Sequence, residues 1–407
     1  MENRQPNITF YLICTAVFLS SSTWFSGTAV TAALSDLWSL NDLQGTWLTI
    51  AVQLGFIFGT ILYSLLNIAD IFRPPLVFFL SALMGALFNG LFAAFAGNLI
   101  SGVILRFLTG LTLAGIYPVG MKLVASWFRK GLGWRLGFMV GALTLGTAFP
   151  YLISSLGEVL HWRLIVAVAS ACSVLGGILI LFLVPVGPYL REKAVLDWRA
   201  AFNLFKDKSF RYQAFGYFGH MWELYAFWSL IGFYLMSGLK EEVVHVNISF
   251  LTFSAIAVGA LGCIAGGWLS KKIGERRVAL YSMAVSGLMC AISGWMFNLP
   301  PVVLVTLVLV WGFFVIADSP QFSALAALCC PPEYTGTALT IQNGIGFGIT
   351  TISIQLLPII ARIIGWRWAF LALVPGPIIG GLALYLLGRH LKSLPEKERM
   401  RITQMHS

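Results

Sequence analysis

Two ionisable side chains stand three residues apart inside a long apolar run of this chain. The segment GHMWELYAFW, residues 219–228, contains His220 and Glu223, and the run around it extends from about residue 211 to residue 236. Residues three apart share one face of an α-helix, so the two side chains are expected to be neighbours. An imidazole and a carboxyl group placed together can accept a proton and pass it on. The pair therefore predicts proton exchange at a buried position.

A structural role for the same two residues is equally open. Glu223 lies 12 residues after Arg211, which corresponds to about 18 Å along a helix, near the centre of a bilayer core about 30 Å thick. A bare charge at that depth costs roughly 2.5 kcal/mol or more, so the carboxyl group must be neutral, paired or in contact with water. The alternative to proton exchange is a hydrogen-bonded pair that ties this helix to a neighbour.

Asp318 is the other acidic residue that lies well inside an apolar run. It belongs to the segment IADSPQ and precedes Pro320 by two residues. A proline deprives a helix of one backbone hydrogen bond and can kink it. Asp318 is therefore a candidate for proton exchange or gating, and a structural hydrogen bond to the freed backbone groups is the alternative.

Arg106 is the only arginine inside an apolar run. A guanidinium group keeps its charge, so it requires an anion or a set of carbonyl oxygens as partners. One hypothesis is recognition of an anionic substrate, or control of the proton site by positive charge. The other is a structural clasp on backbone carbonyl groups.

Uncharged polar and aromatic residues in the same runs are further candidates for contact with a solute. Their hydroxyl, amide and indole groups can form hydrogen bonds to it, and each can instead serve packing. With Arg106, the predicted substrate contacts are Ser20, Thr23, Trp24, Tyr225, Gln342 and Asn343.

The elements that must position these residues are membrane-spanning helices. The chain has 407 residues, of which 58% are hydrophobic and only 10% are charged, whereas soluble domains carry about 25% charged residues. Runs of roughly 20 apolar residues, the length needed to cross a bilayer, recur from end to end. We therefore expect an all-α polytopic membrane protein with twelve spans: residues 8–35, 43–68, 76–96, 99–127, 133–157, 162–185, 211–236, 246–271, 277–297, 300–325, 334–361 and 366–388.

The basic residues orient these spans. Of the 26 lysines and arginines, 20 fall on the side that holds both termini and 4 on the opposite side. Positively charged loops stay in the cytoplasm, so both termini are predicted to be cytoplasmic. The net charge of +10 is thus a topology signal with some attraction to anionic lipid, and nucleic acid is not an expected partner.

The two halves of the chain repeat one another. Matching features recur 201 to 204 residues apart, in the same order: Asp70 with Lys271, Pro118 with Pro320, Gly141 with Gly344, and Trp162-Arg163 with Trp366-Arg367. Repeated halves are typical of carriers whose site lies between them near the midplane. The predicted organisation is an N-terminal six-helix bundle (1–185), a cytoplasmic linker (186–210), a C-terminal six-helix bundle (211–388) and a cytoplasmic tail (389–407).

The chain resembles the major facilitator superfamily along essentially its full length. GGWLSKKIGERR, residues 266–277, is similar to the loop motif of that family, although Lys271 replaces its usual acidic residue. LNIADIFRPP, residues 66–75, keeps the acidic and basic positions of the first-half copy and lacks both glycines. The resemblance implies a gating role at Asp70, Arg73, Lys271, Arg276 and Arg277.

Other segments refine this resemblance. RFLTG, residues 106–110, resembles the intramembrane arginine motif of the family, and GFMVGALTLGTAFP, residues 137–150, lacks the Gly-Pro core of its antiporter motif. STWFSGTAV (22–30), GHMWELYAFW (219–228) and GTALTIQNGIGFG (336–348) look like bacterial carriers of the cyanate- and nitrate-transporter kind. This implies a location in the bacterial cytoplasmic membrane.

These observations favour a secondary active transporter for a small polar or anionic organic solute, with Glu223, His220 and Asp318 as proton-coupling residues. Proton-driven export of amphipathic compounds is the second hypothesis, and a non-transporting sensor or scaffold with the same fold is the third. The sequence shows no P-loop, catalytic triad, HExxH or metal-ligand spacing, so no enzyme activity, cofactor or metal is predicted. The expected partners are the solute, protons and membrane lipid, and the expected oligomeric state is a monomer.

Overall fold

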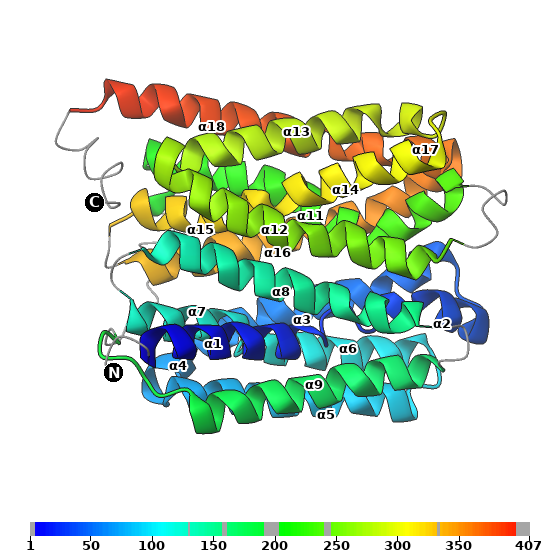
Figure 1. Cartoon of the computed structure of the whole chain (residues 1–407), viewed down its shortest axis with the longest axis horizontal. Coiled ribbons are helices and arrows are strands. Elements are labelled where there is room, and N and C mark those ends of the chain that lie inside the picture. The colour runs from blue at the N-terminus through cyan, green and yellow to red at the C-terminus, as the bar shows by residue number, and fades with distance from the viewer. Residues whose placement is uncertain are drawn as a thin grey trace.

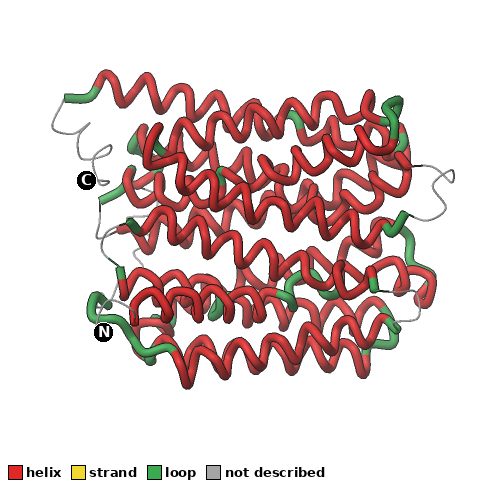
Figure 2. Tube along the Cα trace, viewed as in Figure 1, coloured by secondary structure: helices red, strands yellow, loops and turns green. Residues whose placement is uncertain are grey.

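Helices make up all the regular structure in the part of the chain that is described. The computed structural model describes residues 5–128, 131–156, 161–190, 203–239, 246–331 and 334–395, and no strand occurs in these ranges. Figure 2 shows the helices running alongside one another with short connections. The predicted all-α class is therefore confirmed.

Each half of the chain contributes one group of helices. The first half forms α1 (Gln5–Ser21), η1 (Thr28–Val30), α2 (Thr31–Trp38), α3 (Asp42–Leu65), α4 (Ile68–Ile71), α5 (Pro74–Phe95), α6 (Leu99–Leu113), α7 (Tyr117–Trp127), α8 (Leu132–Ser155) and α9 (Trp162–Leu183). The second half forms α11 (Lys208–Leu239), α12 (Ile248–Ile273), α13 (Glu275–Met296), α14 (Pro301–Ala317), α15 (Ser319–Leu328), α16 (Thr335–Ile364), α17 (Trp366–Ala369), η3 (Phe370–Leu373) and α18 (Pro375–Ser393). Figure 1 shows the two groups side by side.

The twelve predicted spans correspond to these helices. Among the described residues, 10 helical segments are long and apolar enough to cross a membrane. The shorter apolar helix α1 and the 32-residue helix α11 run beside them and complete the twelve. The described chain begins and ends at the same end of the bundle, which we call the termini end. Residues 191–202 of the predicted linker and 396–407 of the predicted tail lie outside the described residues.

The first span is broken, whereas the sequence predicts one continuous helix over residues 8–35. Helix α1 ends at Ser21, and α2 begins only at Thr31. Between them, hydroxyl groups bond to nearby carbonyl oxygens: Thr23 to Ser20 at 3.0 Å and Ser26 to Thr23 at 3.0 Å. Such local bonds compete with the helical ladder. Hydropathy does not register them, which explains why the expectation was wrong.

Two equivalent spans of the repeat break at the same place. Helix α6 gives way to α7 at Tyr117, and α14 gives way to α15 at Ser319, an offset of 202 residues. Pro118 and Pro320 lie in the first turns of α7 and α15, where the missing backbone N–H of proline does no harm. The kink expected near Pro320 is therefore present, and Asp318 is the residue that separates α14 from α15.

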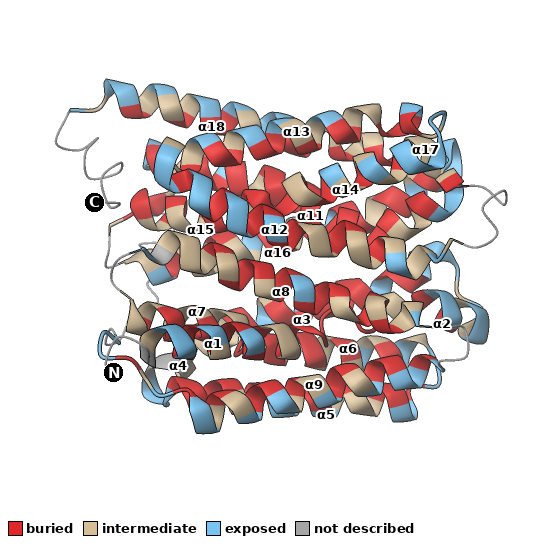
Figure 3. Cartoon of the chain, viewed as in Figure 1, coloured by how far each residue is buried: buried red, intermediate tan, exposed pale blue. Residues whose placement is uncertain are grey.

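The two groups of helices meet along the pairs α8–α12 and α3–α16. Gly137 and Gly141 of α8 lie directly against the carbonyl groups of Cys263 and Ala260 of α12. Small residues allow helix backbones to approach this closely in a membrane. Figure 3 shows buried residues where the helices face one another and exposed residues on the outer helices. Many of the exposed residues are large and apolar, as expected of a surface in contact with lipid.

Polar contacts close this interface at both ends of the bundle. At the termini end, the hydroxyl oxygens of Ser64 on α3 and Thr340 on α16 lie 3.3 Å apart. At the opposite end, the hydroxyl oxygens of Ser154 on α8 and Ser249 on α12 lie 3.2 Å apart, and Thr46 donates a hydrogen bond of 2.7 Å to Gln355. The structure is thus a conformation in which the two groups touch at both ends.

Cysteine cross-linking tests this arrangement. The double variants S64C/T340C and S154C/S249C are both expected to form disulfides, because their side-chain oxygens already lie 3.3 and 3.2 Å apart and a disulfide requires Cβ atoms about 4 Å apart. Mass spectrometry of the purified protein would identify the linked peptides. The pair S154C/T340C, at opposite ends, is the control. A failure of either close pair to link would contradict the conformation described.

Candidate functional site

Glu223 lies inside the second group of helices with three hydrogen-bond donors around its carboxylate. Trp311 Nε1 donates to Oε1 at 2.8 Å, Cys290 Sγ donates to Oε1 at 3.2 Å, and Ser286 Oγ donates to Oε2 at 2.9 Å. The side chain is buried. Helices α13 and α14 therefore supply every one of these partners, and the carboxylate joins α11 to both.

His220 takes a different partner from the one that its spacing predicts. Its Nδ1 lies 2.9 Å from Oδ1 of Asp318, and both side chains are buried. The structure thus brings together two of the three predicted proton-coupling residues and separates the third. His220 and Glu223 share a helical face, but they meet different helices there, α14–α15 and α13–α14. The other ring nitrogen of His220, Nε2, is buried and has no hydrogen-bond partner among the described residues.

Arg106 is held by the broken segment of the first span. Its Nη1 donates to the carbonyl oxygen of Thr23 at 2.9 Å, to Ser26 Oγ at 3.1 Å and to Asn89 Oδ1 at 2.6 Å, and its Nη2 donates to the carbonyl oxygen of Trp24. The side chain is fully buried. This is the clasp on backbone carbonyl groups that the sequence left open as the alternative to direct substrate contact. The positive charge stays buried beside Trp24.

Six aromatic side chains meet where the two groups of helices face each other. The rings of Trp24 and Phe56 are 4.9 Å apart, those of Phe56 and Phe347 are 4.6 Å apart, and those of Tyr225 and Phe347 are 5.1 Å apart. Together with Phe25 and Trp228, which adjoin Tyr225, they form what we call the interface aromatic cluster. Residues from both halves of the chain build it, and all six are buried.

Polar atoms without partners lie at this interface. Within the described part of the chain, the indole N–H groups of Trp24 and Trp228 are buried and make no hydrogen bond. The side-chain nitrogen and oxygen of Gln53 are likewise buried, and neither has a hydrogen-bond partner among the described residues. Gln53 lies 7 residues after Thr46 and 11 before Ser64 on α3, so it shares the face through which those two residues contact α16. Most buried polar groups in proteins are paired, and an unpaired one calls for an explanation such as a ligand.

The other predicted substrate contacts are more dispersed. Thr23 bonds to the carbonyl oxygen of Ser20, and the hydroxyl group of Ser20 is buried without a partner. Gln342 accepts a hydrogen bond of 2.8 Å from Gln213. Asn343 is half-buried on the same helix.

The predicted gating residues lie toward the termini end. Arg276 donates to the carbonyl oxygen of Leu384 at 3.3 Å, and Lys271 Nζ lies 5.3 Å from the ring centroid of Trp134 on α8. Arg73 and Arg277 are exposed. The side chain of Asp70 lies outside the described residues.

The family model for the Major Facilitator Superfamily matches residues 12–354 and, in a second match, residues 214–404. The chain belongs to the major facilitator superfamily. The second match starts near the beginning of the second half of the chain.

Individual members of this superfamily resemble the chain more distantly. The Probable galactarate/D-glucarate transporter GudP of Escherichia coli (strain K12) is 24% identical over 172 residues, which are 41% of this chain and 36% of that relative's length. The match therefore spans about a third of the relative.

Two solved structures share the fold. One is a bacterial homologue of the human lysosomal transporter Spinster in an inward-facing, unoccupied conformation, with a TM-score of 0.70, 14% identity and coverage of 95% of this chain and 97% of that one. The other is a variant of the nucleoside transporter NupG, with a TM-score of 0.69, 14% identity and coverage of 93% and 99%.

Several residues of the candidate site in this chain were not identified from the sequence. Asn89 joins Arg106 to α9, because its Nδ2 donates to the carbonyl oxygen of Val166 at 3.1 Å. Gln53, Trp228 and the donors around Glu223 were also missed. A usable signal exists for the amides: each is a lone polar residue in the middle of an apolar run, and such residues require a partner as ionisable groups do.

The donors around Glu223 predict a difference between two substitutions. Glu223→Ala leaves the buried donors of Trp311 and Cys290 without an acceptor, and each such loss costs about 1–3 kcal/mol; Ser286 keeps only its 3.4 Å bond to the carbonyl oxygen of Met283. Glu223→Gln keeps one carbonyl oxygen and the shape of the side chain, so it should destabilise far less. Thermal unfolding in detergent should show a large drop in Tm for the alanine variant only. Equal Tm values for Glu223→Ala and the wild type would exclude the structural role of this carboxylate.

Proposed function

We propose that this protein is a secondary active transporter that carries a small polar or anionic organic solute by alternating access, coupled to protons. One observation carries the proposal: unpaired polar atoms of Trp24, Gln53 and Trp228 are buried where the two groups of helices face each other. Gln53 stands at the middle of α3, the depth at which carriers built from repeats bind their solutes.

The unpaired groups favour a solute with acceptor oxygens. An indole N–H can only donate a hydrogen bond, whereas a glutamine amide can both donate and accept one. Two donors and one amide therefore match hydroxyl or carboxylate oxygens on a solute. Flat or apolar parts of such a solute would lie against the rings of the interface aromatic cluster.

Positive charge beside this interface favours an anion among such solutes. Arg106 donates its hydrogen bonds to neutral carbonyl and side-chain oxygens. No carboxylate among these partners neutralises its charge. Buried charge acts over longer distances than charge in water. The relative GudP bears the name of a galactarate and D-glucarate transporter, and both compounds are hydroxylated dicarboxylates. We therefore infer that hydroxylated organic acids are the first solutes to test.

The contacts favour His220 and Asp318 as the proton-exchanging pair. Their polar atoms are 2.9 Å apart, so a proton can move between them, and His220 Nε2 is free to bond a second group. Glu223 instead has three neutral donors from its own group of helices, which tie it to α13 and α14. We assign coupling to His220 and Asp318, with Glu223 as the residue that fixes α11 in place.

The remaining assignments follow from topology. The basic side chains at the termini end suit the cytoplasmic side of a bacterial cytoplasmic membrane. Arg73, Lys271, Arg276 and Arg277, with Asp70, would then regulate opening toward the cytoplasm, and the protein would work as a monomer because each chain contains both halves of the site.

Export of amphipathic compounds is the second candidate function. The specific observation in its favour is the interface aromatic cluster, in which six rings outnumber the polar groups. Aromatic surfaces bind apolar molecules with little requirement for a particular shape. Transport of acids should then be weak, and export of amphipathic compounds strong.

Uptake into proteoliposomes tests the solute site. With hydroxylated mono- and dicarboxylates as the panel, Trp228→Phe and Trp24→Phe should each raise KM about fivefold, because each removes one hydrogen-bond donor and keeps an aromatic ring. Trp295→Phe, an exposed tryptophan on α13, is the matched control. If no solute in the panel is transported, or if all three variants behave alike, the proposed site is wrong.

Imposed pH gradients test the coupling. An inward proton gradient should accelerate uptake by the wild type and by Glu223→Gln, whereas Asp318→Asn and His220→Asn should lose the acceleration and keep exchange of internal for external solute. Full acceleration in Asp318→Asn would remove the pair from the coupling mechanism.

Locking the interface tests alternating access itself. Disulfides in S64C/T340C and in S154C/S249C should each abolish uptake, and reduction should restore it, because both ends must open in turn. Uptake that survives either lock would contradict the mechanism.

A further inference from the structure

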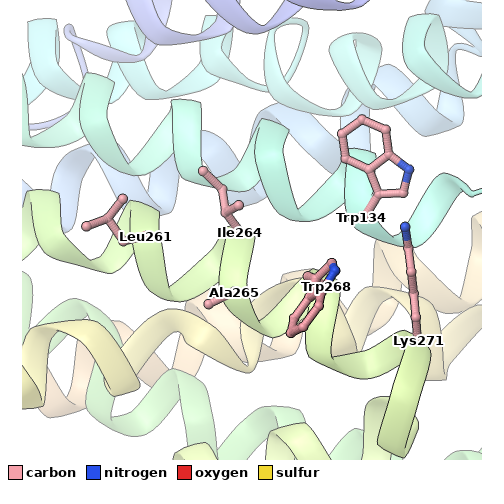
Figure 4. A pocket seen from close by; sticks show the side chains of 6 residues that line it. All are labelled: Trp134, Leu261, Ile264, Ala265, Trp268 and Lys271. Atoms are coloured by element: carbon pink, nitrogen blue, oxygen red, sulfur yellow. The ribbon is translucent and has the colours of Figure 1, made fainter.

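A groove lies between α8 and α12 on the outside of the bundle, toward the termini end. Its volume is about 360 Å³, and it is lined by Trp134 of α8 and by Leu261, Ile264, Ala265, Trp268 and Lys271 of α12. Figure 4 shows the apolar side chains following one another along α12, with Lys271 and Trp134 together at one end. None of these residues belongs to the solute site proposed above.

The residues of α12 in this groove form one continuous stripe. They are spaced three and four residues apart, which keeps them on a single helical face. Leu261 and Trp268 are well exposed, at 61% and 56%, although both are large apolar side chains. From Leu261 to Lys271 the stripe measures about 15 Å along the helix, which is the depth of one leaflet of a bilayer.

The charged end of the stripe suits an anion. Lys271 Nζ lies 5.3 Å from the ring centroid of Trp134, and Lys272 Nζ lies 3.9 Å from that of Trp268. Within the described ranges, no acidic side chain forms a salt bridge with either lysine. Basic groups between transmembrane helices at the membrane surface bind anionic lipid headgroups.

We propose that this groove binds one molecule of an anionic phospholipid. Its phosphate group binds Lys271, and one acyl chain follows Leu261, Ile264 and Trp268 toward the middle of the membrane. Two observations select this occupant. The apolar stripe has the length of an acyl chain in one leaflet, and the cation stands at the end where the headgroup would lie.

Because the groove lies between helices of the two halves, a lipid bound in it affects how the halves are arranged. Helix α8 belongs to the first half of the chain and α12 to the second, and their backbones pack closely where Gly267 faces the Cα atoms of Trp134 and Gly137. A lipid that contacts both helices binds better when they are together than when they are apart. The bound lipid therefore stabilises the conformation in which the termini end is closed.

Lipid retention tests the site without any measurement of transport. The purified protein in nanodiscs of phosphatidylcholine, alone or with a minority of phosphatidylglycerol, is examined by native mass spectrometry and by thermal unfolding. The wild type should retain one phosphatidylglycerol and unfold at a higher temperature with that lipid present. Lys271→Gln should weaken retention about fivefold, the effect of one lysine at an anionic surface. Trp268→Ala should also weaken it by loss of apolar contact.

Lys392→Gln is the matched control, because Lys392 is an exposed lysine in the last turn of α18 and does not line the groove. The proposal is overturned if Lys271→Gln retains phosphatidylglycerol as the wild type does, if phosphatidylcholine is retained equally well, or if Lys392→Gln reduces retention as much as Lys271→Gln. The proposal is also overturned if the wild type forms dimers and Trp268→Ala does not. A second copy of the chain would then cover the groove.

Discussion

A guanidinium group that cannot lose its charge governs the architecture of the first half. Within the described residues no carboxylate bonds to Arg106, and its two terminal nitrogens donate to the carbonyl oxygens of Thr23 and Trp24 and to Ser26 and Asn89, while Nε is buried without a partner. Those carbonyl groups are available only because the first span is broken there. The break and the buried arginine therefore require each other: an intact helix would leave the charge without partners, and a neutral residue would leave the broken backbone unpaired.

In the second half, side chains rather than backbone groups face the buried ionisable residues. Glu223 is surrounded by donors of α13 and α14, and His220 pairs with Asp318 at the junction of α14 and α15. A side-chain pair can gain or lose a proton and keep its helices intact, whereas carbonyl oxygens cannot take up a proton in this way. The repeat is thus symmetric in its helices and asymmetric in its chemistry, and the groups proposed to respond to protons all lie on one side of the interface.

The sequence predicts the features that depend on one segment at a time. The number of spans follows from apolar length, and the break near Pro320 follows from the chemistry of proline, whereas the equivalent break near Pro118 was not predicted. Features that depend on the neighbour of a helix do not follow. His220 and Glu223 share a face by spacing, yet that spacing does not tell which helix covers each of them. Gln53 escaped notice because a single amide barely lowers the hydropathy of α3, although its lack of a partner is evident once the helices are assembled.

The interface between the halves is where these two kinds of chemistry meet. Trp24 is positioned by the clasp on its own carbonyl group, while Tyr225 and Trp228 lie on α11, the helix that also carries His220 and Glu223. A solute bound among these rings would contact, on one side, the segment around Trp24 that Arg106 holds. On the other side it would contact α11, which carries the ionisable residues. Proton uptake at His220 and Asp318 would then act on α11 together with α13 and α14, to which Glu223 ties it, against a stationary partner. Coupling between the proposed solute and proton sites requires only that one helix contact both, and α11 does.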